Sequence, residues 1–161
     1  MKIGSRSIGP GHPVYIIAEI GVNHQGDPDK ARELLNLAVI AGVDAVKFQK
    51  RDLEQVYTRD VLENTDKYER GYQYVIPILK KVELSKETHA DLAKRCKEVG
   101  IDYLCTPFDV ESADFINSLG VPAFKVASSD LTNIPLIEHL VKFGKPLILS
   151  TGAATKEEVY T

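Results

Sequence analysis

The sequence predicts an α/β fold built on a parallel β-sheet, because short apolar runs alternate with amphipathic helical patterns along its 161 residues. Gly42, Gly100, Gly120 and Gly144 each close a helical pattern and open a new apolar run, as expected where a left-handed residue ends a helix. Each run ends in a polar or ionisable residue. The runs that predict buried strands are residues 15–19, 43–47, 101–106, 124–128 and 147–150.

Each helical pattern begins at a residue that suits a helix cap. Asp27 is followed by Pro28, a pair that favours the start of a helix. The other expected N-caps are Ser85, Asp109 and Asn133, and a further helix is expected over residues 155–161. Strands and helices in this order predict a parallel sheet with right-handed crossovers.

Two segments depart from this alternation. Residues 51–84 are too long for an ordinary strand-to-helix connection, and they predict an insert with a helix within residues 68–81 despite Pro77. Residues 2–14, with several glycines and prolines, predict a small hairpin at the bottom of the sheet. Because the insert leaves the carboxyl edge of the sheet, we expect it to shape a substrate pocket there.

The composition excludes several classes of function. A formal net charge of −3 without a basic run gives no electrostatic basis for binding nucleic acid or an anionic membrane. The sequence has no apolar run of about 18 residues and no signal-peptide pattern at its start. Cys96 and Cys105 lack metal-ligand spacing and predict buried free thiols in a reducing compartment. We therefore expect a cytoplasmic protein.

Periodicity alone does not distinguish a doubly wound sheet from a barrel. A glycine-rich phosphate loop after the first strand would favour the doubly wound sheet. Residues 20–26 match neither G-x-G-x-x-G nor G-x-x-x-x-G-K, which weighs against a nucleotide-binding fold.

Glu19, Lys47 and Lys125 are the strongest indications of a functional site. Charged side chains are rarely buried without a partner, and ligands of βα proteins bind at the carboxyl ends of the parallel strands. Two lysines that meet hydroxyl groups at this edge would bind a phosphate or another oxyanion. The hydroxyl groups expected there belong to Thr106, Ser128 and Ser150. The alternative is a structural ion pair between Glu19 and one of the lysines.

The histidines give a weaker signal. His24 lies in the loop after the first strand, where it either contacts substrate or stabilises the loop. His89 and His139 are expected on the surfaces of helices, and His12 at the bottom of the sheet. No pair of histidines has metal-ligand spacing, so we assign no metal ligand within this chain.

Five motifs follow one another over nearly the whole chain. They are AEIGVNHQG (18–26), VKFQ (46–49), CTPF (105–108), FKVAS (124–128) and PLILSTG (146–152). Together they resemble the sialic acid (N-acetylneuraminate) synthase family, which includes the legionaminate and pseudaminate synthases. The resemblance implies an α/β fold of the (β/α)8 TIM-barrel type, with this chain covering about the first four and a half βα units.

The resemblance also implies a reaction. The family condenses phosphoenolpyruvate with an N-acylated amino sugar, N-acetylmannosamine or a diacetamido-trideoxyhexose, to give a nonulosonic acid and phosphate. By motif, Glu19 handles the proton and Gln49 faces the amino sugar. Contacts with phosphoenolpyruvate are implied for Lys47, Thr106, Lys125, Ser128 and Ser150. The resemblance further implies a homodimer and a Mn²⁺ or Mg²⁺ ion whose ligands are expected outside this chain.

Two departures from the family pattern bear on this expectation. Ser129 and Asp130 follow Ser128 where sialic acid synthases usually have Gly-Glu, so Asp130 is a substrate-binding candidate with a shorter side chain. The identity of the sugar therefore stays open. A complete barrel needs roughly 250 residues. Residues 1–161 are thus expected to form the N-terminal portion of the synthase barrel, without its remainder or a C-terminal antifreeze-like domain, and to be inactive alone.

Two other interpretations remain at this point. The chain is alternatively a non-catalytic anion-binding or assembly module, because an open half-barrel exposes sheet edges that need partners. In the third interpretation, an aldolase-type barrel forms a Schiff base at Lys47 or Lys125.

Overall fold

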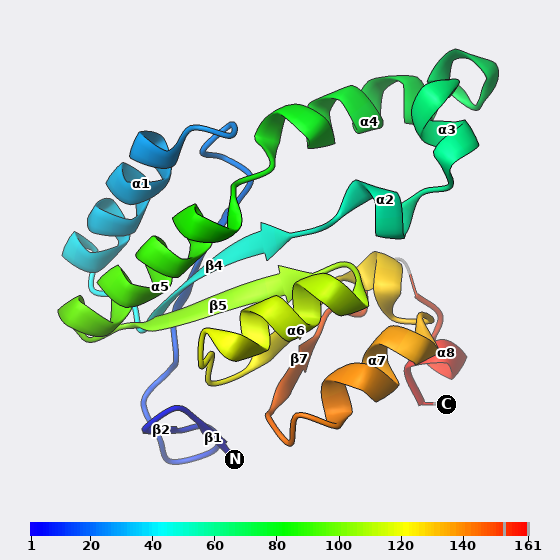
Figure 1. The fold of residues 1–161 in the computed structure, drawn as a ribbon. Helices are drawn as coiled ribbons and strands as arrows, with labels where there is room; N and C mark the ends of the chain where they lie inside the picture. Colours follow the sequence, from blue (N-terminus) through cyan, green and yellow to red (C-terminus); the bar gives the residue numbers. More distant parts are fainter. Residues whose placement is uncertain (153, 161) are drawn as a thin grey trace.

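The structure is a computed structural model that describes residues 1–152 and 154–160, and its centre is a set of parallel strands in chain order. The strands are β3 (Ile17–Gly21), β4 (Ala45–Lys50), β5 (Asp102–Pro107), β6 (Phe124–Val126) and β7 (Leu147–Leu149). β3, β4 and β5 form one hydrogen-bonded ladder and β6 and β7 another, with β6 beside β5 (Figure 1). A doubly wound sheet reverses its strand order at a switch point, whereas a barrel adds strands in sequence. The observed order is that of the predicted (β/α)8-barrel type.

Helices on one face of the sheet build the core with it (Figure 1). Within the described ranges these are α1 (Pro28–Ile40), α5 (Lys86–Val99), α6 (Val110–Ser118) and α7 (Ile134–Val141). The four predicted caps are confirmed, because each side chain accepts a hydrogen bond from a backbone N–H of the first turn. The final helix, α8 (Lys156–Tyr160), also agrees with the prediction, while Thr161 lies outside the described residues. No helix in the described part of the chain is long and apolar enough to cross a membrane.

The two faces of β4 carry different side chains. Val46 and Phe48 pack into the core beneath the helices, whereas Ala45 belongs to a second apolar cluster on the other side of the sheet. Because side chains alternate along a strand, Lys47 points to the same inner face as Ala45. The strand continues for three residues past the predicted end at Lys47, so this lysine lies within the strand.

A hairpin closes the amino-terminal end of the strands, as predicted. It consists of β1 (Lys2–Ile3) and β2 (Arg6–Ser7), which pair in antiparallel orientation. Ile3 is buried against Ala45 and Leu104 of the inner face. Ligands therefore have access from the opposite, carboxyl edge.

The insert after β4 is helical and extends beyond the carboxyl ends of the strands (Figure 1). Its elements are α2 (Leu53–Val56), α3 (Arg59–Glu63), the 3-10 turn η1 (Thr65–Lys67) and α4 (Arg70–Val82), which contains Pro77 as predicted. The buried Asp109 carboxylate fixes the start of the insert by accepting a hydrogen bond from the Asp52 N–H at 2.7 Å. Its end is held at Glu83, which lies 2.7 Å from Lys50 Nζ. A groove of about 940 Å³ separates the insert from α5 and α6.

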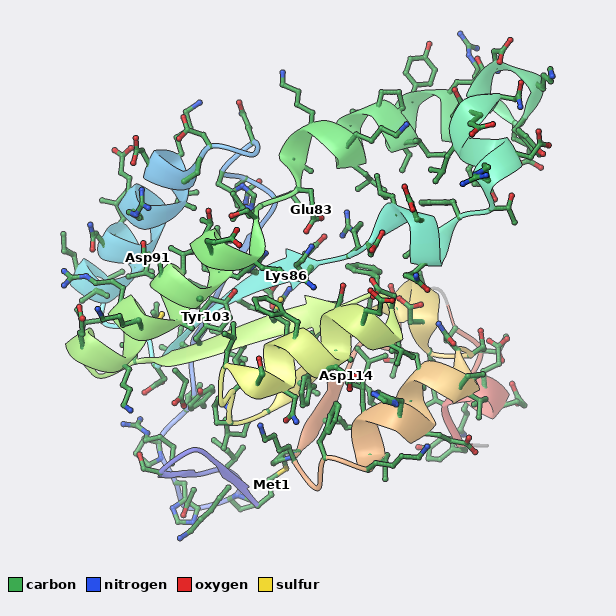
Figure 2. The ribbon with its side chains drawn as sticks, in the orientation of Figure 1. Met1, Glu83, Lys86, Asp91, Tyr103 and Asp114 are labelled. Atoms are coloured by element: carbon green, nitrogen blue, oxygen red, sulfur yellow. The ribbon has the colours of Figure 1, made fainter. Side chains whose placement is uncertain are left out.

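His89 is buried, so the prediction that it lies on the surface is wrong. Its ring packs among Phe48, Tyr103 and Phe115, and Nδ1 lies 2.6 Å from the Tyr103 hydroxyl. Figure 2 shows Tyr103 on β5, beneath α5. Burial, with a smaller contribution from nearby Lys50, lowers the pKa of His89 to about 3. The ring is therefore neutral in the folded protein near neutral pH.

This burial predicts a loss of stability in acid. The unfolded chain takes up a proton at His89 near pH 6.5, whereas the folded ring stays neutral to about pH 3. Below about pH 6.5 the unfolded state binds more protons, so the free energy of unfolding falls by up to about 1.4 kcal/mol per pH unit. We expect His89→Gln to lose less stability than the wild type between about pH 7 and pH 5 in thermal unfolding. His12→Gln, at an exposed site, should behave as the wild type. Equal acid sensitivity of His89→Gln and wild type would contradict the assignment.

The two cysteines are buried free thiols, as predicted. Burial raises the pKa of Cys96 and of Cys105 to about 12. Both thiols are therefore protonated and unreactive near neutral pH.

Candidate active site

Lys47 is a buried cation on the inner face of the sheet, held by groups from both neighbouring strands. The residue is 4% exposed, and its Nζ lies 2.9 Å from Glu19 Oε2 on β3. It also donates a hydrogen bond to Thr106 Oγ1 on β5, at 3.1 Å. The parallel register explains the first contact, because Glu19 is paired directly with Lys47. Three predicted site residues thus meet at one point.

The ion pair between Glu19 and a lysine, which was the structural alternative, is therefore present, but only its lysine is buried. The Glu19 side chain is 58% exposed, whereas that of Lys47 is 5% exposed. An exposed carboxylate contributes little to stability through such a pair. Glu19 is consequently accessible to a ligand while it holds Lys47 in place.

Lys125 and Ser150 form the second part of the site. The Lys125 ammonium group donates hydrogen bonds to Ser150 Oγ and to the Val126 carbonyl, the latter at 2.6 Å. A Cβ built on Gly152 would lie 3.7 Å from Ser128 Cβ, so the segment after β7 passes close to Ser128. Lys125, Ser128 and Ser150 therefore lie together at the carboxyl ends of β6 and β7.

Lys47 and Lys125 are close enough to interact electrostatically. Partial burial lowers the pKa of Lys125, and repulsion by Lys47 lowers it further, while Glu19 opposes the shift. Two positive groups that repel one another are stabilised when an anion binds between them. The site is thus suited to a phosphate or carboxylate.

The lowered pKa of Lys125 predicts that anion binding weakens as the pH rises. Above this pKa the amine is neutral and loses its attraction for the anion, and the loss begins below the ordinary value of 10.5. We expect the affinity of the full-length protein for phosphoenolpyruvate to fall already as the pH rises toward the ordinary lysine value of 10.5. In Lys125→Arg the fall should begin at higher pH, because a guanidinium keeps its proton. Titration calorimetry across this range tests the expectation, and identical profiles for the two proteins would contradict it.

Gln49 and Asp130 lie near the site but make other contacts. Gln49 shares the inner face of β4 with Lys47, and its Oε1 accepts a hydrogen bond from Arg51. Asp130 ends the 3-10 turn η2 (Ser128–Asp130), where it accepts hydrogen bonds from Asn133 at 3.1 Å and from Ser129 at 3.3 Å. In the described part of the chain, neither side chain hydrogen-bonds to the lysines, so their roles in substrate binding stay predictions.

His24 stabilises the loop after β3. The residue is 1% exposed, its Nδ1 accepts a hydrogen bond from the Gly26 N–H at 3.1 Å, and the Gly21 carbonyl is its second backbone partner. Burial lowers the pKa of His24, so the ring stays neutral. Of the two roles considered for His24, the structure supports the loop contact.

The sequence analysis did not predict two further buried cations near the site, Lys50 and Arg51. Lys50 and Arg51 are 8% and 5% exposed, and both line the groove beneath the insert. Lys50 pairs with Glu83, which Figure 2 shows at the junction of α4 and α5. The signal in the sequence is two adjacent cations directly after an apolar strand, the same signal that marks Lys47.

The described residues provide no set of ligands for the divalent metal that the family resemblance implies. Across residues 1–152 and 154–160, no three His, Cys, Asp or Glu side chains gather in a way that could hold a metal ion. The carboxylate nearest the lysines, Glu19, is already paired with Lys47. The residues present do not fit a metal by themselves, and we derive no step of chemistry through one.

The fold and the site together define a protein of the βα-barrel class with two lysines, Lys47 and Lys125, near the carboxyl edge of its strands. Residues 34–161 match the NeuB family, and the chain belongs to this family. Human N-acetylneuraminate-9-phosphate synthase is 38% identical over 160 residues, which are 96% of this chain and 44% of that protein. The N,N'-diacetyllegionaminic acid synthase of Legionella pneumophila is also 38% identical over 160 residues, 97% of this chain and 44% of that protein.

A solved structure agrees with these relatives. The N-acetylneuraminic acid synthetase of Leptospira borgpetersenii, in complex with citrate, superposes with a TM-score of 0.86 at 31% identity. The match covers 99% of this chain and 52% of that chain. The chain thus spans about half the length of the relatives that it matches.

Proposed function

We propose that the protein carrying this chain condenses phosphoenolpyruvate with an N-acylated amino sugar, giving a sialic-type nonulosonic acid and phosphate. The observation that carries the proposal is the pair of ammonium groups, Lys47 and Lys125, set among strand-end hydroxyls with Glu19 beside them. The relatives named as N-acetylneuraminate-9-phosphate and diacetyllegionaminic acid synthases support the same reaction class. N-acetylmannosamine and diacetamido-trideoxyhexoses are the proposed sugars.

Phosphoenolpyruvate offers two anionic groups to this arrangement. In the proposed roles, Lys47 and Lys125 bind its phosphate and carboxylate, with hydrogen bonds from Thr106, Ser128 and Ser150. Fixed cations and hydroxyl dipoles in a partly dry site stabilise an anion more strongly than water does. They also hold C3 of phosphoenolpyruvate close to the aldehyde carbon of the open-chain sugar.

The bond changes define what Glu19 has to do. C3 of phosphoenolpyruvate bonds to the aldehyde carbon, and the aldehyde oxygen gains a proton. Water adds its oxygen to C2 and loses a proton. The new C2 hydroxyl then loses its proton and becomes the keto group as the C2–O bond breaks and phosphate leaves. Glu19 is proposed to move one of these protons, since its carboxylate is accessible and lies 2.9 Å from Lys47 Nζ. Lys47 keeps that carboxylate in position.

We also propose a cytoplasmic homodimer that uses Mn²⁺ or Mg²⁺. These proposals rest on family resemblance.

Phosphate release by the full-length protein tests the proposed reaction. Phosphoenolpyruvate and Mn²⁺ are combined with N-acetylmannosamine or a diacetamido sugar, and we expect phosphate release that depends on the sugar. Absence of release with every such sugar would refute the proposal. Thermal stabilisation by phosphoenolpyruvate without any turnover would instead support the non-catalytic anion-binding module. Borohydride trapping with a keto-sugar tests the Schiff-base alternative.

A further inference from the structure

Arg51 is a buried cation whose partners are unusual for its charge. It directly follows β4, is 5% exposed, and carries its guanidinium carbon 4.2 Å above the Phe108 ring. Its Nη2 donates a hydrogen bond to Gln49 Oε1. None of the ion pairs within residues 1–152 and 154–160 includes Arg51. An aromatic face and an amide oxygen are therefore what hold it.

This contact fixes which way the Gln49 amide faces. A guanidinium group only donates hydrogen bonds, so the atom of Gln49 that meets Arg51 must be the carbonyl oxygen. The amide nitrogen then points away from Arg51, and Gln49 Nε2 lies 3.5 Å from the position that a Cβ on Gly21 would take. Gly21 is on β3, two residues beyond Glu19. The donor end of the Gln49 amide thus lies beside β3, the strand that carries the proposed acid–base residue.

Phe108 restrains the other side of Arg51. It follows the last residue of β5, and its N–H donates a hydrogen bond to the Lys50 carbonyl at 3.1 Å. The aromatic ring is therefore fixed to the same strand end as Arg51, and stacking restricts the guanidinium plane. A restrained donor loses little conformational entropy when it orients a neighbour.

We propose that Arg51 is a positioning residue that holds the Gln49 carboxamide with its N–H donors toward the amino sugar, so that Gln49 recognises an acceptor oxygen of that sugar. The inference rests on the proposed function. It assigns to the site a preference for an oxygen acceptor at this position, because the side-chain acceptor atom of Gln49 is engaged by Arg51. Without Arg51 the amide is free to rotate and presents either end to the substrate.

Steady-state kinetics of the full-length protein test this role. Arg51→Met keeps the aliphatic stem over Phe108 but removes every donor. We expect the KM for the amino sugar to rise about tenfold, as for one lost hydrogen bond, with the KM for phosphoenolpyruvate unchanged. Arg51→Lys, which retains one donor, should give a smaller rise. Arg59→Met is the matched control, because this arginine lines the same groove but is largely exposed.

A double variant separates positioning from a general structural effect. If Arg51 acts through Gln49, Arg51→Met adds no further rise in the KM for the sugar in a Gln49→Ala protein. Additive effects, or an equal rise in the KM for phosphoenolpyruvate, would refute the positioning role of Arg51 and leave the proposed function standing. A wild-type enzyme that turns over no amino sugar would refute the proposed function and this role together.

Discussion

Replacing Glu19 with glutamine is expected to reduce phosphate release about a thousandfold while phosphoenolpyruvate still binds, because the amide cannot transfer a proton. Glutamine has the same shape and can still accept a hydrogen bond from Lys47, so the lysines proposed to bind the anion stay in place. The measurements are single-turnover phosphate release and the affinity for phosphoenolpyruvate, both in the full-length protein. A separation of the two quantities would identify Glu19 as the proton-handling residue.

Glu83→Gln is the matched control for this substitution. Glu83 also pairs with a buried lysine of β4, but Lys50 points to the outer face of the strand. We expect this variant to lose some stability and to keep turnover within about twofold of the wild type. Retained turnover in Glu19→Gln would remove Glu19 from the chemistry. Equal losses in both variants would indicate that Glu19 acts only through the stability of the protein.

The fold was predictable because each of its signals is local. Glycine at the end of a helix, a capping side chain at its start and an apolar run between them each depend on a few neighbouring residues. The four caps and the strand order agree with these signals. Barrel closure involves residues far apart in sequence, so periodicity alone could not exclude a doubly wound sheet.

The buried contacts of Lys47 and Lys125 were predictable for a different reason. A lysine in an apolar strand is costly unless a partner or a ligand satisfies it, so the position of Lys47 and Lys125 in apolar runs is enough to mark them. Their exact place in the strand was not predictable. Lys47 faces inward and Phe48 faces the core on the outer side, so the strand continues past Lys47 to Lys50. The charged residue therefore did not mark the end of the strand.

Residues whose partners lie far along the chain escaped prediction. His89 is buried beside Tyr103 of the next strand, whose hydroxyl lies 2.6 Å from its Nδ1, and the helical pattern of α5 alone did not reveal this contact. Arg51 owes its burial to Phe108, at the end of another strand. Burial of polar groups depends on such partners, which periodicity does not encode.

Replacing Lys47 with methionine is expected to weaken phosphoenolpyruvate binding about a hundredfold, the effect of losing a charge-assisted hydrogen bond. Two effects combine in this variant. The ammonium group that attracts the anion is lost, and the Glu19 carboxylate is left without its partner at 2.9 Å, where it repels the incoming phosphate. Adding Glu19→Gln to Lys47→Met removes that repulsion, so the double variant should bind phosphoenolpyruvate more tightly than Lys47→Met alone.

Lys50→Met distinguishes loss of the anion site from loss of a buried ion pair. Lys50 lies three residues further along the same strand, is also buried, and pairs with Glu83 at 2.7 Å. Because it points to the outer face, its removal should lower the melting temperature without changing the affinity for phosphoenolpyruvate. Calorimetric titration of both variants gives the comparison. Equal loss of affinity would show that any buried lysine of β4 supports binding through stability, and an unchanged affinity in Lys47→Met would place the anion elsewhere.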